Sequence, residues 1–113
     1  MVTVTDVRRY LGNISSELLS DEQIQQAIDV ATAEVNAKLP SDAPLRDNAI
    51  LVLAAYHAYL SYATSLETVA GIVPAIVLSK LQLLKQEAER LLSYAATRPQ
   101  LYVGESYLDT DTN

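Results

Sequence analysis

The side chains that most often carry catalysis or bind metals are few in this sequence and form no recognisable site. His57 is the only histidine, and no carboxylate lies three or four residues away from it. A zinc site generally needs three or four ligands, so a single imidazole predicts a packed or hydrogen-bonded residue instead. The chain has no cysteine, which excludes thiolate ligands and thiol nucleophiles.

The acidic residues and glycines give no stronger signal. Asp21–Glu22 and Glu87/Glu89 fall on helix faces predicted to meet water, where hydration explains them. The ending DTDT alternates possible calcium ligands, but it lacks the glycine and closing glutamate of a calcium loop. Three scattered glycines make no phosphate-binding loop. We therefore expect a protein that is not an enzyme and has no catalytic, cofactor or metal site.

The tyrosines are more informative. The chain has seven Tyr and no Phe or Trp, and Tyr56, Tyr59 and Tyr62 lie in one predicted helix. A tyrosine buries a large ring while its hydroxyl needs a partner, so it suits the border between a core and an interface. Two interpretations stay open at this point: core tyrosines whose hydroxyls reach solvent, or a seam between subunits.

These tyrosines belong to an uncharged segment, AILVLAAYHAYLSYA (residues 49–63), that is apolar on nearly every side. Such a helix must be covered on more than one side. It is shorter than the roughly 20 apolar residues of a membrane span and contains a histidine and three tyrosines, so we expect no membrane contact. Because a short chain has few helices to cover it, we expect a subunit interface at Ile50, Leu51, Tyr59 and Tyr62.

Four helices are predicted around this segment, at about residues 3–12, 20–39, 44–64 and 74–97. Ser20 and Gln23 match a capping box, and Thr3 with Asp6 nearly does. Pro44 and Pro74 suit the first position of a helix. The fold class is therefore all-α, a small bundle of about four helices with an extended C-terminal tail. Gly71 and Pro74 interrupt the helical pattern in residues 65–73, the least regular stretch.

Two helices have clear apolar stripes. In the second helix the stripe comprises Ile24, Ala27, Ile28, Ala31, Val35 and Leu39. In the last helix it comprises Val77, Leu81, Leu84, Ala88, Leu91, Leu92 and Ala95, and it is widened by Ile76, Leu83 and Tyr94. We expect both stripes to face the core.

The composition changes after Arg98–Pro99, where the last helix is expected to stop. Residues 1–98 are predicted to form the helical domain, and residues 99–113 an extended or flexible C-terminal arm. The arm is either a frayed terminus or a segment that becomes ordered on a partner, for example by adding a strand to a sheet edge.

The order of the elements resembles the small helical head–tail connector proteins, also called head-completion or adaptor proteins, of tailed bacteriophages and related archaeal viruses. The likeness lies in TVTDVRRYLG, LLSDEQIQQAIDVATAEVNAKL and the alanine- and tyrosine-rich AILVLAAYHAYLSYA. Members typically begin with a short capped helix ending in Tyr-Leu. A Leu-x-Asp-x-x-Ile helix entry follows, and then a hydrophobic helix rich in small residues and aromatics. The long fourth helix departs from many relatives.

The resemblance implies a virion structural protein at the head–tail junction, present in the host cytoplasm during assembly. It implies a homo-oligomeric ring, commonly of twelve copies, that docks beneath the portal protein and extends the DNA channel. The ring would offer a platform to a neck or tail-completion protein, and packaged DNA would pass through without specific binding. Relatives tend to anchor on the portal through a C-terminal segment, which here corresponds to Leu101, Tyr102, Val103, Tyr107 and Leu108.

A second class of function is a small helical regulatory module that binds DNA or resembles an antitoxin. Residues 4–11 and 21–39 have the outline of a helix-turn-helix pair. The second of these helices is rich in glutamine but short of Arg and Lys, which weakens that interpretation. The formal net charge of −6 also argues against general binding to phosphate backbones.

Overall fold

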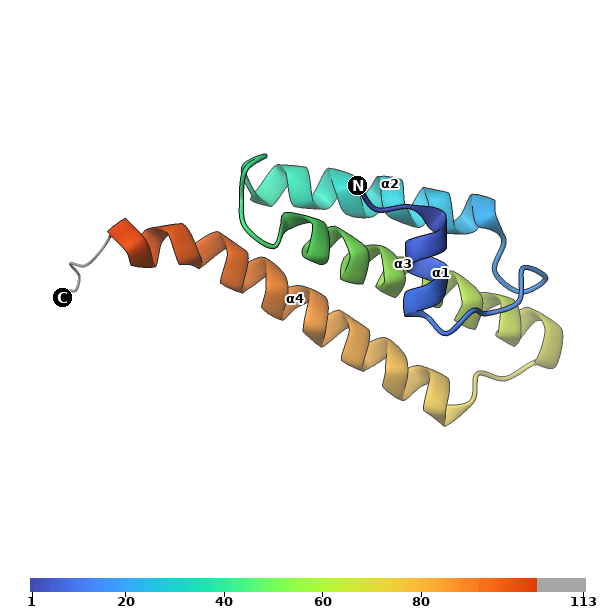
Figure 1. Cartoon of the computed structure of the whole chain (residues 1–113). Coiled ribbons are helices and arrows are strands. Elements are labelled where there is room, and N and C mark those ends of the chain that lie inside the picture. Colours follow the sequence, from blue (N-terminus) through green and yellow to red (C-terminus); the bar gives the residue numbers. More distant parts are fainter. Residues whose placement is uncertain (104–113) are drawn as a thin grey trace.

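The computed structural model describes the backbone of residues 1–103 and the side chains of residues 1–93. It contains α1 (Val4–Tyr10), α2 (Asp21–Lys38), α3 (Arg46–Ala70) and α4 (Ala75–Val103), and no strand occurs within residues 1–103 (Figure 1). The prediction of an all-α fold with four helices is therefore confirmed for this part of the chain.

The helix α3 lies at the centre of the arrangement. α2 and α4 pack along it, while the short α1 crosses it and also contacts α2 (Figure 1). α2 and α4 barely touch one another, so α3 separates them. The predicted stripe of α2 is buried in full, and that of α4 is buried at Val77, Leu81, Leu84, Ala88 and Leu91. One hydrophobic core thus runs along both sides of α3.

The starts of α1 and α2 are both capped by reciprocal hydrogen bonds, as their capping-box patterns predicted. At α1 the Thr3 hydroxyl accepts from the Asp6 N–H at 3.2 Å, and the Asp6 carboxylate accepts from the Thr3 N–H at 3.0 Å. Ser20 and Gln23 form the same pair at α2, with distances of 3.1 and 2.9 Å. Donation from the backbone and side chain of Thr3 lowers the pKa of Asp6 below its ordinary value.

Arg8 fastens α1 to the connection that leads into α2. Its guanidinium donates to the carbonyl oxygens of Ile14 at 2.6 Å and Leu19 at 2.9 Å. It also pairs with the Asp21 carboxylate at 2.7 Å, and only 19% of the Arg8 side chain is exposed. The planar guanidinium can hold three acceptors at fixed angles, which a lysine cannot. A loop without secondary structure is thereby held in one path.

The third helix differs from its predicted bounds at both ends. It begins at Arg46 and not at Pro44, because Leu45 takes a left-handed conformation with φ 62°. It continues past Thr64 to Ala70, and the hydroxyls of Thr64, Ser65 and Thr68 donate to carbonyls one turn back, at 3.1 Å each. The helix ends at Ala70 and is capped by Gly71, whose φ of 78° is the left-handed conformation that glycine adopts without strain.

The fourth helix is also longer than predicted. Pro74 stands just before it and accepts the first hydrogen bonds through its carbonyl, from the N–H groups of Val77 and Leu78. The expected stop at Arg98–Pro99 is wrong, because the helical backbone continues through Pro99 to Val103. A proline inside a helix removes one hydrogen bond, and the turns on either side supply the others. The remainder of the expected arm, residues 104–113, lies outside the described residues.

The close approach of three helices to α3 depends on its small side chains. Ala49, Ala54, Ala55 and Ala58 are each 0% exposed. Their methyl groups fill the space between the helices and still let the helix backbones approach closely. A densely packed interior of this kind tolerates little added side-chain volume.

We predict that Ala58→Leu destabilises the fold by about 1–3 kcal/mol, because the added atoms have no space on a fully buried helix face. The free energy of unfolding in urea, followed by circular dichroism, measures this. The matched control is Ala70→Leu at the exposed end of the same helix, which should change stability by no more than about 0.5 kcal/mol. Equal effects of the two variants would contradict the packing argument.

Candidate functional site

The four residues expected to form a subunit interface divide into two groups. Ile50 and Tyr59 are each only 6% exposed, because the chain's own helices cover them. Leu51 and Tyr62 are half-buried and pack against the same core. Contacts within the chain therefore account for the burial of Ile50 and Tyr59. An interface at Leu51 and Tyr62 stays a prediction.

Tyr59 is the centre of a small polar–aromatic cluster between α3 and α4. The Tyr62 ring lies 5.2 Å from it, and the Lys80 ammonium sits 5.1 Å above it. That ammonium also lies 3.5 Å from the Leu11 carbonyl oxygen at the end of α1. Burial, with a smaller contribution from Tyr62, raises the pKa of Tyr59 above its ordinary value. The cluster joins three helices and has the character of a structural contact.

His57 links α3 to α2. Its Nε2 lies 2.7 Å from the Glu34 Oε1, and its ring packs 5.2 Å from that of Tyr56. The acidic partner comes from a neighbouring helix, which spacing along the sequence alone does not reveal. Within the described residues, no three His, Cys, Asp or Glu side chains gather closely enough to hold a metal ion.

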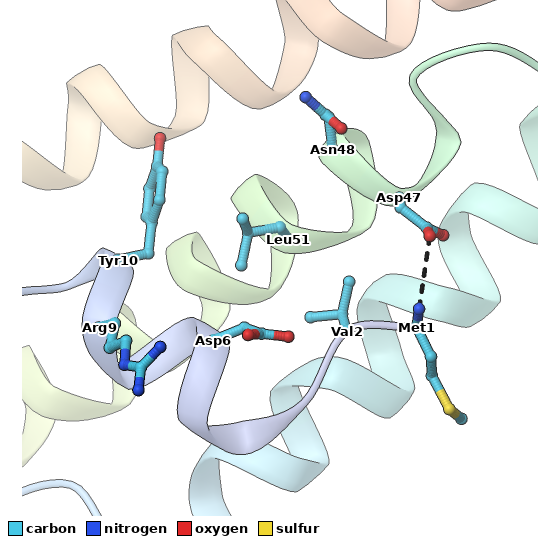
Figure 2. Close-up of a pocket in the computed structure, with 8 residues that line it drawn as sticks. All are labelled: Met1, Val2, Asp6, Arg9, Tyr10, Asp47, Asn48 and Leu51. Atoms are coloured by element: carbon cyan, nitrogen blue, oxygen red, sulfur yellow. Dashed lines mark ion pairs between the residues drawn. The ribbon is translucent and has the colours of Figure 1, made fainter.

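An open hollow lies between the N-terminal segment, α1 and α3 (Figure 2). Leu51 and Val2 form its apolar floor, and the Met1 amino group stands 3.5 Å from the Asp47 carboxylate. The other carboxylate at this hollow, Asp6, is engaged in capping α1. No histidine, serine or threonine lines the hollow.

A more distinctive surface is the groove between the end of α1 and the first half of α4. We call it the α1–α4 groove, and it is lined by Tyr10, Ile76, Ser79, Lys80, Leu83, Leu84 and Glu87. Ile76 is 78% and Leu83 65% exposed. Their predicted place in the core stripe is therefore wrong, because both lie beside the surface of α4 that meets α3 and not within it.

The residues expected to anchor the chain on a portal lie at or beyond the end of α4. Leu101, Tyr102 and Val103 belong to its last helical turn by their backbone, so this part is not extended. Their side chains, together with the whole of Tyr107 and Leu108, lie outside the described residues. Anchoring by this segment stays a prediction.

By length and composition, α3 is the one helix in the described part of the chain that is apolar enough to cross a membrane. Half of its most apolar stretch is buried inside the fold. Core helices of proteins without membrane spans have the same character, and the contacts of α3 with the other three helices account for its apolar composition here.

Comparison with known proteins adds no relative: no protein-family model, curated protein or solved structure matches the chain.

We predict that Tyr59→Phe makes the fold less sensitive to alkali. Because folding raises the pKa of Tyr59, the stability linked to its protonated hydroxyl is present in full below the unfolded pKa of about 10. It is lost as the pH rises through the higher folded pKa, and phenylalanine has no proton to lose.

Urea unfolding at pH 8 and at about pH 11 measures the difference. Wild type should lose more stability between the two pH values than Tyr59→Phe, whereas the exposed control Tyr10→Phe should behave as wild type. An equal loss in wild type and Tyr59→Phe would contradict the assignment.

Proposed function

We propose that this chain is a virion structural protein, a head–tail adaptor that forms a ring beneath the portal. The ring extends the DNA channel and provides the docking platform for the neck or tail. A short capped α1, a capped α2 and an alanine- and tyrosine-rich α3 follow one another as in the head–tail connector proteins that the sequence resembles.

The observation that carries this proposal is the projection of α4 beyond the other helices. Its 29 residues span about 43 Å at roughly 1.5 Å per residue. In Figure 1 its C-terminal end extends well past the connection between α2 and α3. Leu91 is the last buried side chain in the described part of α4. The helix thus carries Leu101–Val103 away from the body, where a portal subunit can reach them.

The opposite end of the molecule offers a second apolar surface. Val69, at the end of α3, is 76% exposed, and Ile72, in the turn to α4, is 67% exposed. This turn lies at the end of α4 remote from its C-terminus (Figure 1). Two separate contacts, one for the portal and one for a neck or tail-completion protein, suit an adaptor. We assign the portal to the C-terminal end and the tail-side partner to the turn.

The charge of the chain supports passage of DNA without binding. The formal net charge is −6, and affinity for a phosphate backbone requires clustered Lys and Arg. An acidic ring surrounding a channel repels the duplex and lets it move. Such a protein would reside at the head–tail junction of the virion and, during assembly, in the host cytoplasm.

A regulatory DNA-binding role has less support from the geometry. The residues between α1 and α2 form a connection that is much longer than the three- or four-residue turn of a helix-turn-helix. The outer face of α2 presents Glu22 and Asp29, and the only basic residue of that helix is Lys38 at its end. A recognition helix with this charge pattern would be repelled by the phosphates on either side of the groove.

We predict that deleting residues 101–113 abolishes attachment to the portal protein encoded with this chain and leaves the fold intact. The deletion removes no side chain that is buried in the described core. Co-sedimentation with purified portal rings measures attachment, and thermal unfolding checks the fold.

The matched control deletes only residues 109–113. It removes the acidic ending but keeps Leu101 to Leu108, so it should sediment with the portal as wild type does. Full attachment of the longer deletion would reject the arm as the anchor. Failure of the wild type to attach would reject the adaptor function itself.

A further inference from the structure

The outer face of α2 is an exposed ridge that carries one glutamine followed by three smaller side chains. Gln26, Val30, Ala33 and Ala37 follow one another at intervals of four, three and four residues, and all are exposed. They point away from the stripe that packs on α3. We call this surface the α2 ridge. Val30 exposes 48% of its surface, and no other helix in the described part of the chain covers this face of α2.

The α1–α4 groove has a matching periodicity. Ile76, Lys80, Leu83 and Glu87 line it at intervals of four, three and four residues, and Tyr10 of α1 forms part of its other side. Side chains at this spacing form one line along a helix, as in helices that pack side by side. The large side chains of the groove and the small ones of the ridge are complementary in size.

The charges of the two surfaces are also complementary. Glu22 and Asp29 border the ridge, and no basic side chain lies between them on α2. In the groove, the Glu87 carboxylate is held by Arg90 at 2.6 and 3.1 Å. Lys80 has no carboxylate within ion-pair distance in the described part of the chain and contacts only the Leu11 carbonyl and the Tyr59 ring. The groove thus offers an uncompensated cation to an acidic ridge.

A single molecule cannot join its own ridge to its own groove. α2 and α4 lie on different sides of α3 (Figure 1). The ridge residues are exposed and lie opposite the stripe of α2 that packs on α3. A contact between the two surfaces therefore requires two copies of the chain. It is heterologous, since each copy contributes a different surface, and repetition of such a contact gives a ring or a filament.

We propose that the α2 ridge of one copy packs into the α1–α4 groove of the next and forms the subunit seam. The inference deepens the proposed function, on which it rests for the ring. It places the seam on α2 and α4, whereas the sequence predicted it on α3, where Ile50 and Tyr59 are already covered.

Cysteine cross-linking tests the seam without interference, because the natural chain has no cysteine. The double variant Val30→Cys with Leu83→Cys should give a ladder of covalent multimers on oxidation at high protein concentration. A disulfide requires Cα atoms within about 7 Å, so only copies joined ridge to groove can react efficiently. Each single variant should yield no species larger than a dimer. Both positions are exposed, so circular dichroism should show the fold unchanged.

The matched control pairs Val69→Cys with Leu83→Cys, because Val69 is exposed and apolar but lies outside the ridge. This control should give no ladder. A ladder of equal yield in the control, or none in the Val30–Leu83 pair, overturns the seam. Attachment of the reduced wild-type protein to the portal is measured separately. If the wild type attaches but the Val30–Leu83 pair gives no ladder, the seam alone is rejected. A ladder without attachment supports the seam and rejects the adaptor function.

Discussion

The fold depends on the packing of three helices against one central helix whose buried face is made largely of alanine. Ala49, Ala54, Ala55 and Ala58 expose nothing to solvent, and α1, α2 and α4 all contact the helix that carries them. Because α1, α2 and α4 bury this face of α3, including Ile50 and Tyr59, those residues are not free to meet another subunit. Exposed apolar side chains in the described part of the chain remain on the outer sides of α2 and α4 and in the turn that joins α3 to α4.

Hydrogen bonds at the ends of helices position the elements around this core. The capping boxes at Thr3 and Ser20 fix where α1 and α2 begin. Arg8 holds the connection between them through two carbonyl oxygens and one carboxylate. Lys80 reaches back from α4 to the last turn of α1. These contacts keep Tyr10 beside α4, and Tyr10 completes the α1–α4 groove.

Features set by neighbours in sequence could be predicted, and features set by tertiary contacts could not. The capping boxes and the stripe of α2 follow from local spacing, and the structure has them as predicted. The way the other helices pack over Ile50 and Tyr59 has no local signal, so the sequence predicted a subunit interface there. The apolar character of Ile76 and Leu83 predicted burial, yet which side of α4 meets α3 is decided by packing. The helix α3 also continues to Ala70, through residues that the local sequence pattern placed in an irregular stretch.

The central claim is that copies of this chain form a ring on a portal. Electron microscopy of the purified protein mixed with its portal measures this directly. The account predicts a closed ring at the lower end of the portal, with the C-terminal end of α4 toward the portal and the α3–α4 turn away from it. Portal particles that remain bare at saturating protein, or a ring that attaches by the α3–α4 turn, would contradict it.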